Sequence, residues 1–251
     1  MRKIALLPPF LVLILWQALS TLGVLPHFKV PSPFEILIAL KTLLVDGLPQ
    51  GYLLHRHAIE SLVRVFSGFF IASFLAIPMG IVMGWSSRIR MLLTPFVEIL
   101  RPIPPLAWIP IAIVWFGIGI KSAAFIIFLG AFFPILLNTI SGVLTLDVHL
   151  LEATKVLGAK EKHILTKVLA PGSLPSIWTG LRVGLGIAWM TVVAAEFTGV
   201  KSGYGLGYLI MIARDIQRPD LVVAGMITIG LTGYGLDIIS RKVERRLLRW
   251  M

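Results

Sequence analysis

Six long runs of apolar residues, almost free of charge, constrain this sequence more than any other feature. The runs cover residues 4–22, 66–85, 103–120, 123–146, 183–200 and 221–236, and the fifth contains one acidic residue, Glu196. The hydrocarbon core of a bilayer is about 30 Å thick, so a helix needs about 20 apolar residues to cross it. The 251 residues leave room for six crossings and little more. We therefore predict an all-α integral membrane protein with about six transmembrane helices.

The composition supports this fold class. Only 14% of the residues are charged, whereas about a quarter are charged in an average soluble domain. The formal net charge of +11 would suggest a nucleic-acid partner in a soluble protein. Here the basic residues lie at the boundaries of the apolar runs, as in cytoplasmic loops of membrane proteins, so no nucleic-acid partner is expected. The absence of cysteine excludes disulfide bonds and a cysteine nucleophile.

The distribution of basic residues predicts that both termini are cytoplasmic. With the amino terminus inside, fourteen Lys and Arg residues lie on the inner side and eight, including Arg56 and Arg64, on the outer side. Cytoplasmic loops of membrane proteins carry such an excess. The first run is not expected to be a cleaved signal peptide, because Pro8 and Pro9 interrupt its start and it is long enough to cross.

The outer segment between the first two runs, residues 23–61, contains one predicted helix. Apolar residues recur between positions 34 and 45, which favours a short interfacial helix. His55 and His57 are two positions apart and would not share one face of a helix. We expect solvated loop histidines there rather than a metal site.

The segment between the fourth and fifth runs, residues 144–175, predicts two short helices joined by a bend at Gly158. Each helix has an apolar face, made of Leu150, Ala153 and Leu157 before the bend, and of Ile164, Leu165, Val168 and Leu169 after it. The charged positions around the bend, expected to be exposed, are Lys155, Lys160, Glu161, Lys162 and His163. Pro171 and Pro175 are expected to stop the second helix before the next crossing.

This segment resembles the cytoplasmic loop of the inner-membrane permease subunits of ATP-binding cassette importers that use a substrate-binding protein. The signature of that loop is Glu-Ala-Ala, three residues, Gly, nine residues and then Ile-x-Leu-Pro. The matching positions here are Glu152, Ala153, Thr154, Gly158, Val168, Ala170 and Pro171. Three of them depart from the signature, with Thr for the second Ala, Val for Ile and Ala for Leu, and all three roughly keep size or apolarity.

The resemblance implies a type I importer permease fold, similar to MetI, in the inner membrane of a prokaryote. It implies a cytoplasmic ATPase dimer, an extracytoplasmic binding protein, a second permease copy in a homodimer and membrane lipid as partners, with ATP and Mg²⁺ bound by the ATPases and no cofactor in this chain. The ATPase-coupling positions would be Glu152, Ala153, Thr154, Gly158, Ala159, Lys160, Glu161, Lys162 and Pro171.

The resemblance extends to residues 100–119 and 195–210, which look like those of the nitrate, sulfonate, taurine and bicarbonate branch of that family. It therefore implies import of a small anion, with the choice among these four left open. The implied organisation is a first crossing and extracytoplasmic segment at 1–60, a permease core at 61–240 with its coupling loop at 145–175, and a basic cytoplasmic tail at 241–251.

The third run begins in a proline-rich segment that cannot form a regular helix, and this marks a candidate pathway element. Pro102, Pro104, Pro105 and Pro110 lie close together, so the segment should be kinked or partly unwound. Glu98 and Arg101 are three apart and could pair on a helix face. An ionisable residue at membrane depth is a functional candidate, whereas at the interface the pair would be structural. In the first case Arg101 would attract an anion.

The other candidates for the translocation pathway are Trp108, Asn138 and Glu196. Glu196 would lie near the outer end of its helix, as a gate residue, a contact for the binding protein or a polar helix cap. Asn138 could line the pathway, although an interhelical hydrogen bond is the commoner role. Trp108, like Trp85 and Trp115, fits interface anchoring or packing better than a ligand site.

Two further patterns concern packing and energy source. Gly80 with Gly84, and Gly180 with Gly184, are small-xxx-small pairs that permit close helix packing. The chain has no phosphate-binding loop, since the nearest string, GIGIKS, lacks the glycine before its lysine, so it is not expected to be an enzyme. The rival interpretation is an ion-gradient-driven secondary transporter or channel, for which only Glu98 and Glu196 would qualify as buried carboxylates.

Overall fold

The computed structural model describes residues 7–26, 29–197 and 203–247, and all regular elements in these residues are helices. The chain forms two compact units. The first comprises Met1–Ser61 and Gly199–Thr232, and the second comprises Leu62–Thr198 and Gly233–Met251. Helices α3 (Leu54–Trp85) and α12 (Pro219–Leu247) contribute residues to both units.

The first unit contains α1 (Leu7–Thr21), α2 (Pro33–Val45), α11 (Leu206–Asp215) and the first turns of α3 and α12. Helix α2 starts at a capping box, in which the Ser32 hydroxyl accepts a hydrogen bond from the Glu35 N–H and the Glu35 carboxylate accepts one from the Ser32 N–H at 2.7 Å. This pairing satisfies two of the free N–H groups at a helix start. The predicted helix at 34–45 is thus confirmed.

The prediction that His55 and His57 are solvated loop residues is wrong. Both lie in the first turn of α3, and although His55 is exposed, His57 is fully buried. The N–H of Gly205 donates to Nδ1 of His57 at 3.0 Å, and the N–H of Leu206 donates to the hydroxyl of Ser61 at 2.9 Å. These bonds join the start of α11 to the start of α3 within the first unit, a tertiary contact that short-range spacing cannot predict.

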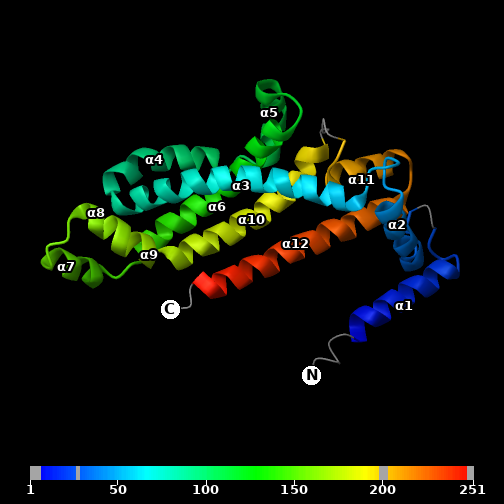
Figure 1. Ribbon diagram of the computed structural model, residues 1–251, viewed down its shortest axis with the longest axis horizontal. Coiled ribbons are helices and arrows are strands. Elements are labelled where there is room, and N and C mark those ends of the chain that lie inside the picture. Colours follow the sequence, from blue (N-terminus) through cyan, green and yellow to red (C-terminus); the bar gives the residue numbers. More distant parts are fainter. Residues whose placement is uncertain (1–6, 27–28, 198–202, 248–251) are drawn as a thin grey trace. The chain divides into compact units, whose positions relative to one another are not determined.

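The second unit contains the remaining elements of the chain (Figure 1). They are α4 (Ser87–Leu100), the 3₁₀ helix η2 (Pro105–Trp108), α5 (Ile109–Phe116), α6 (Ile120–Leu144), α7 (Val148–Val156), α8 (Glu161–Ile164), the π-helical turn η3 (Leu165–Leu169), α9 (Ala170–Gly172) and α10 (Leu174–Phe197). Most of α3 and the end of α12 belong to this unit too, and within it α6 and α10 pack extensively against each other.

Close contacts at glycines hold α6 against α3 on one side and α10 on the other. A side chain at Gly80 or Gly84 of α3 would overlap Thr139 or Val143 of α6 at 2.6 and 2.5 Å. On α10, a side chain at Gly180 would lie 2.8 Å from Cβ of Asn138, and one at Gly184 would lie 2.9 Å from Ile135. The two predicted small-xxx-small pairs are therefore confirmed as packing sites within one chain.

Four of the six predicted crossings correspond to long apolar helices. They are α3, α6, α10 and α12, each between 24 and 32 residues long, and each begins at or before the start predicted for it. The third predicted crossing, at 103–120, is not a straight helix, because α4 and the η2–α5 helix form a pair bent by 82°. The expected break in the proline-rich segment at the start of this crossing is thus confirmed.

The predicted bounds of the first run, the fifth run and the tail can be compared with the observed helices only in part. The first run, 4–22, corresponds to α1 from Leu7 to Thr21, whereas residues 4–6 lie outside the described residues. The fifth run ends at 200, beyond the last described residue of α10. The predicted tail at 241–251 begins inside α12, which continues to Leu247, and residues 248–251 lie outside the described residues.

We predict that Gly68→Ala destabilises the protein by about 1–3 kcal/mol, a typical cost of overpacking. An added Cβ at Gly68 would lie 2.6 Å from the backbone oxygen of Ala124, which cannot move aside easily. Thermal unfolding in detergent measures the effect. Gly230→Ala, where the new Cβ would have no atom within 4 Å, is the matched control. Equal stability of the two variants would contradict the assigned α3–α6 packing.

Candidate functional site

The sequence motif between α6 and α10 folds as two helices around a glycine, as predicted. Helix α7 starts at Asp147, whose carboxylate accepts the N–H of His149 at 2.9 Å. At its other end the N–H of Gly158 donates to the Lys155 oxygen at 2.9 Å, and the N–H of Ala159 donates to the Thr154 oxygen at 3.1 Å. This is a Schellman cap, and Gly158 adopts the left-handed φ of 75° that such a cap requires. The glycine of the motif is therefore explained by local geometry.

The tip of α7 is apolar and exposed, which differs from the prediction. Leu150, Ala153 and Leu157 were expected to form a face packed on the protein, but all three are exposed. Val156 and Leu157 at the tip are 87% and 84% exposed. Among the described residues no helix covers this face beyond the tight cap that ends α7, so the apolar face remains open. A protruding helix with exposed apolar residues is a surface suited to docking another protein.

The charged positions around the bend lie as predicted. Lys155, Lys160, Glu161, Lys162 and His163 are all exposed. Glu152, the first residue of the motif, is also exposed and lies 3.7 Å from Nδ1 of His149. Lys155 places its ammonium group 6.0 Å from the centroid of the Trp85 ring, at the end of α3. We define the tip surface as the exposed residues from 148 to 163, which combine apolar side chains with basic ones.

The base of the tip surface is packed into the second unit. Ile164 and Leu169 are buried in a cluster with Val143 at the end of α6, and Trp85 packs against that cluster. This confirms the predicted apolar face after the bend. It also means that α8 and η3 are held between the ends of α3 and α6.

The expectation that Pro171 and Pro175 stop the second helix is wrong. The backbone remains helical from Glu161 into α10, with a π-helical turn at Leu165–Leu169, in which the N–H of Ala170 reaches back five residues to Leu165, and a single turn residue at 173. The wider turn accommodates Pro171 directly after it, at a position near a helix start where a proline is tolerated. Pro175 likewise lies in the first turn of α10.

The bend between α4 and η2 forms one wall of a cleft. Arg101 ends α4, and its backbone N–H bonds to the Val97 oxygen at 2.9 Å. The cleft has a volume of about 340 Å³. Its lining combines the bend with α6 and one residue of α10: Arg101, Ile103, Pro105, Leu129, Gly130, Phe133, Pro134, Leu137 and Ile187. Arg101 is the one charged residue of this lining, so the cleft offers a cation with no neutralising carboxylate.

The predicted Glu98–Arg101 ion pair is not formed. Both side chains are exposed, and no ion pair between them occurs among the described residues. Since the backbone at Arg101 is still helical, with its N–H bonded to the Val97 oxygen, the three-residue spacing is kept and only the side chains do not meet. Of the other predicted pathway residues, Pro105 lines the cleft, whereas Pro104 caps η2 without lining it. The Trp108 ring packs edge-on against Phe125 of α6, with centroids 6.4 Å apart.

Asn138 does not make the interhelical hydrogen bond that was considered its commoner role. Its Nδ2 donates to the backbone oxygen of Pro134, one turn earlier in α6, at 2.8 Å. Its Cβ faces Gly180 of α10 instead. The side chain is half-buried and is absent from the cleft lining.

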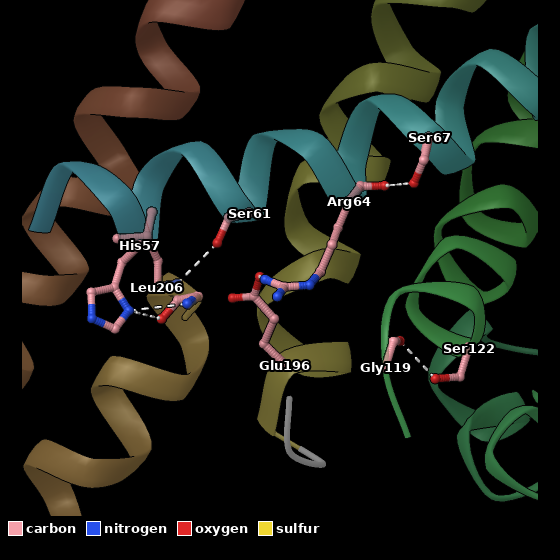
Figure 2. A network of polar contacts seen from close by, with 9 residues as sticks. His57, Ser61, Arg64, Ser67, Gly119, Ser122, Glu196 and Leu206 are labelled. Carbon is pink, nitrogen blue, oxygen red and sulfur yellow. Dashed lines mark hydrogen bonds and ion pairs between the residues drawn. The ribbon is translucent and has the colours of Figure 1, made fainter. Parts of the chain in front are cut away.

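Glu196 is fully buried near the end of α10, where it binds Arg64 of α3. Figure 2 shows the two side chains pointing toward one another, and Nη1 of Arg64 lies 2.8 Å from Oε1 of Glu196. Both are almost inaccessible to solvent, at 3% and 0%. Arg64 lies within α3, which starts ten residues before it, at Leu54, and not at the boundary of the second predicted run at residue 66. One oxygen of the Glu196 carboxylate thus accepts a hydrogen bond from an arginine on another helix.

Sequence reasoning missed a second set of ion pairs, between α10 and α12. Nε of Arg182 lies 3.0 Å from Oδ1 of Asp237, which also binds Arg241 one turn later. Arg182 also approaches Glu244 at 3.7 Å. The four-residue spacing of Asp237 and Arg241 was a usable signal for the helical pair. Nothing local pointed to Arg182, which is 55 positions from Asp237.

Comparison with known proteins is consistent with this architecture. Residues 76–249 match the family described as binding-protein-dependent transport system inner membrane component. A protein of Methanocaldococcus jannaschii named as an ABC transporter permease is 48% identical over 96% of this chain and 90% of its own length. The taurine transport system permease protein TauC of Escherichia coli is 36% identical over 95% of this chain and 86% of its length.

Among solved structures, the MetNI methionine ABC transporter, in inward-facing conformations, contains a chain of similar fold. The TM-score is 0.70 at 21% identity, and the match covers 78% of this chain and 96% of the other. At this identity the likeness concerns the fold, and it agrees with the MetI-like fold expected from the sequence.

We predict that Glu196→Gln and Arg64→Gln each destabilise the protein by about 3–5 kcal/mol, because each leaves a buried charge without its partner. The double variant Arg64→Gln/Glu196→Gln should be more stable than the sum of the two single losses predicts, since it buries no charge. Unfolding of the four proteins in one detergent forms a double-mutant cycle. Additive losses in the double variant would show that the pair is not coupled.

Proposed function

Because the chain belongs to the binding-protein-dependent transport system inner membrane component family, we propose that it is the permease subunit of an ATP-driven importer of a small anion. It would couple ATP hydrolysis by partner ATPases to movement of the substrate through the membrane. The observation that carries this proposal is the tip surface, a capped helix that protrudes with its apolar end exposed. The permease role is that of a transport component and not of an enzyme.

The tip surface has the properties that docking to an ATPase requires. Val156 and Leu157 offer apolar side chains to a groove on the partner, and the surrounding lysines offer charge. Apolar burial supplies most of the affinity of such an interface, and charges at its rim set orientation. The Schellman cap at Gly158 fixes the direction in which the tip points.

A displacement of α7 would be transmitted to the membrane helices through close contacts. The base of the tip surface packs on Val143 of α6. A side chain at Gly172 would overlap Leu146 at 2.7 Å, and one at Gly142 would overlap Ser176 of α10 at 2.5 Å. Closely packed contacts of this kind are hardly compressible. A displacement of the tip surface would therefore also displace the ends of α6 and α10.

The substrate class follows from the cleft and the relatives together. Arg101 provides one positive charge in a cleft otherwise lined by apolar and glycine residues. Arg101 is exposed, and no carboxylate shares this lining with it, so its charge is available to an anion. The relative TauC is named for taurine, which carries a sulfonate group. We propose a small anion such as a sulfonate, taurine, nitrate or bicarbonate.

The proposed assembly contains two copies of this chain, two cytoplasmic ATPases that bind ATP and Mg²⁺, and an extracytoplasmic binding protein. Both termini would lie on the cytoplasmic side, as the basic residues indicate. ATP binding would draw the ATPases together, move the paired tip surfaces and switch the access of the central pathway. Candidate pathway residues beyond Arg101 and Pro105 are Glu98, Pro104, Trp108, Asn138 and Glu196, and the last would act through its pair with Arg64.

The test of this function is ATP hydrolysis by the reconstituted complex. The chain, its ATPase and its binding protein are incorporated into vesicles, and hydrolysis is measured with and without the anion. Stimulation by substrate supports the proposal. Uptake that persists without any ATPase, driven by an ion gradient, would support the rival secondary transporter and overturn it.

We predict that Leu157→Asp weakens association with the ATPase at least tenfold and lowers substrate-stimulated hydrolysis accordingly. Burying a leucine side chain contributes about 1.5–3 kcal/mol, and a carboxylate there would oppose burial. Pull-down of the ATPase with the tagged permease measures the effect. Leu247→Asp, at another exposed leucine near a helix end, is the matched control. If Leu157→Asp associates with the ATPase as tightly as the wild type, the tip surface does not form the interface.

We predict that Arg101→Ala lowers anion uptake about tenfold or more while complex assembly is retained, because the cleft loses its one charge. Arg101→Lys should restore part of the uptake. Arg88→Ala, at an exposed arginine near the opposite end of α4, serves as the control. Uptake by Arg101→Ala equal to that of the wild type would exclude a role in transport.

A further inference from the structure

The second unit has another groove, distinct from the Arg101 cleft, between α3 and the start of α6. Its volume is about 440 Å³. It is lined by three residues of α3 and by the segment around the start of α6: Ser67, Ile71, Leu75, Phe116, Ile120, Lys121, Ala124, Phe125 and Phe128. All but Ser67 and Lys121 are apolar, and neither residue is part of the coupling or pathway arrangement described above.

The two polar residues of this groove lie at the same end. Helices α3 and α6 run parallel, because Gly68 packs against Ala124 and Gly80 packs against Thr139. Ser67 is therefore level with the first turn of α6, which contains Lys121, and Figure 2 shows Ser67 and the start of α6 on the same side of the view. From that end the groove continues along α3 to Leu75, about 12 Å at 1.5 Å per residue. The groove is thus amphipathic along its length.

The apolar walls are built from aromatic rings on one side and aliphatic side chains on the other. Phe125 lies between Phe116 and Phe128, with ring centroids 5.4 and 6.4 Å away. Across the groove, Ile71 and Leu75 of α3 are 51% and 47% exposed. A long hydrocarbon chain would cover these surfaces, and each methylene buried contributes about 0.8 kcal/mol on transfer from water, less where lipid already covers the surface.

Lys121 provides the charge at the polar end. It is the second residue of α6 and is exposed, and within the part of the chain that the structure describes no ion pair involves it. Helix α6 has 25 residues and is about 38 Å long, longer than the hydrocarbon core of about 30 Å. Its first turn therefore lies at headgroup level, and the positive end of the helix dipole adds to the lysine charge.

We propose that this groove binds one anionic phospholipid, with an acyl chain along Ile71, Leu75 and Phe128 and the phosphate beside Lys121. The distribution of charge along the groove favours this occupant. The groove has a lysine at one end and apolar side chains along the rest, and a phospholipid has an anionic headgroup at one end and hydrocarbon along the rest. A second copy of the chain would have to place an apolar surface along the groove and an anionic group opposite Lys121.

The test is native mass spectrometry of the full-length chain in detergent, titrated with phosphatidylglycerol or with phosphatidylcholine. Wild-type protein should bind phosphatidylglycerol more tightly, and Lys121→Gln should weaken that binding about fivefold and abolish the preference, as expected for one lysine near an anionic headgroup. Lys41→Gln, at an exposed lysine on α2, is the control that should change nothing. Ile71→Trp, which fills the groove, should weaken binding of both lipids.

Two results would overturn the proposal. The first is equal affinity of the wild type and Lys121→Gln for phosphatidylglycerol. The second concerns the alternative occupant, a second copy of the chain. Since the chain has no cysteine, Ile71→Cys introduces a unique thiol, and oxidation in vesicles should give no disulfide-linked dimer. Efficient dimer formation would show that another copy covers the groove.

Discussion

The close packing of α6 against two neighbours is the constraint on which the second unit depends. Glycines on α3 and α10 let the backbones approach until an added side chain would overlap α6, as at Gly84 and Gly184. In a bilayer this matters more than in water, because helices there associate by close packing rather than by exclusion from solvent. The Arg101 cleft, the Lys121 groove and the base of the tip surface all use residues of α6. The arrangement of one helix thus positions three surfaces of different chemistry.

Departures from regular helix occur where the chain has functional candidates. The 82° bend between α4 and η2 creates the wall of the Arg101 cleft, and the π-helical turn at Leu165–Leu169 joins the tip surface to α10. A backbone that leaves helical geometry at membrane depth needs protein or water to satisfy its polar groups. Protein packs on the bend from α6, since Pro105 lies beside Gly130 and both residues line the Arg101 cleft. The proline-rich sequence predicts the break, and the packing makes it tolerable.

The sequence predicts the parts of this structure that are encoded locally, but not the long-range polar contacts. Apolar length predicted four helices, and the glycine spacing of the motif predicted the bend at Gly158. The Arg64–Glu196 pair was not predicted, because 132 positions separate the two residues and Arg64 lies just before the predicted start of a hydrophobic run. The burial of His57 was not predicted for the same reason, because its partner Gly205 is 148 positions away in the sequence. The exposed Leu157 was misassigned because periodicity identifies an apolar face without saying whether anything covers it.

The two ends of α10 are fixed in different ways, and this restricts how the helix can move. Near its start, Ser176 fits against Gly142 of α6, next to the base of the tip surface. Near its other end, Glu196 is paired with Arg64 of α3 in a buried environment. Separating α10 from α3 would break this buried ion pair, at a cost of about 3–5 kcal/mol. A displacement received at the tip surface therefore reaches the start of α10 through Gly142 and Ser176, while the buried ion pair ties the other end of α10 to α3.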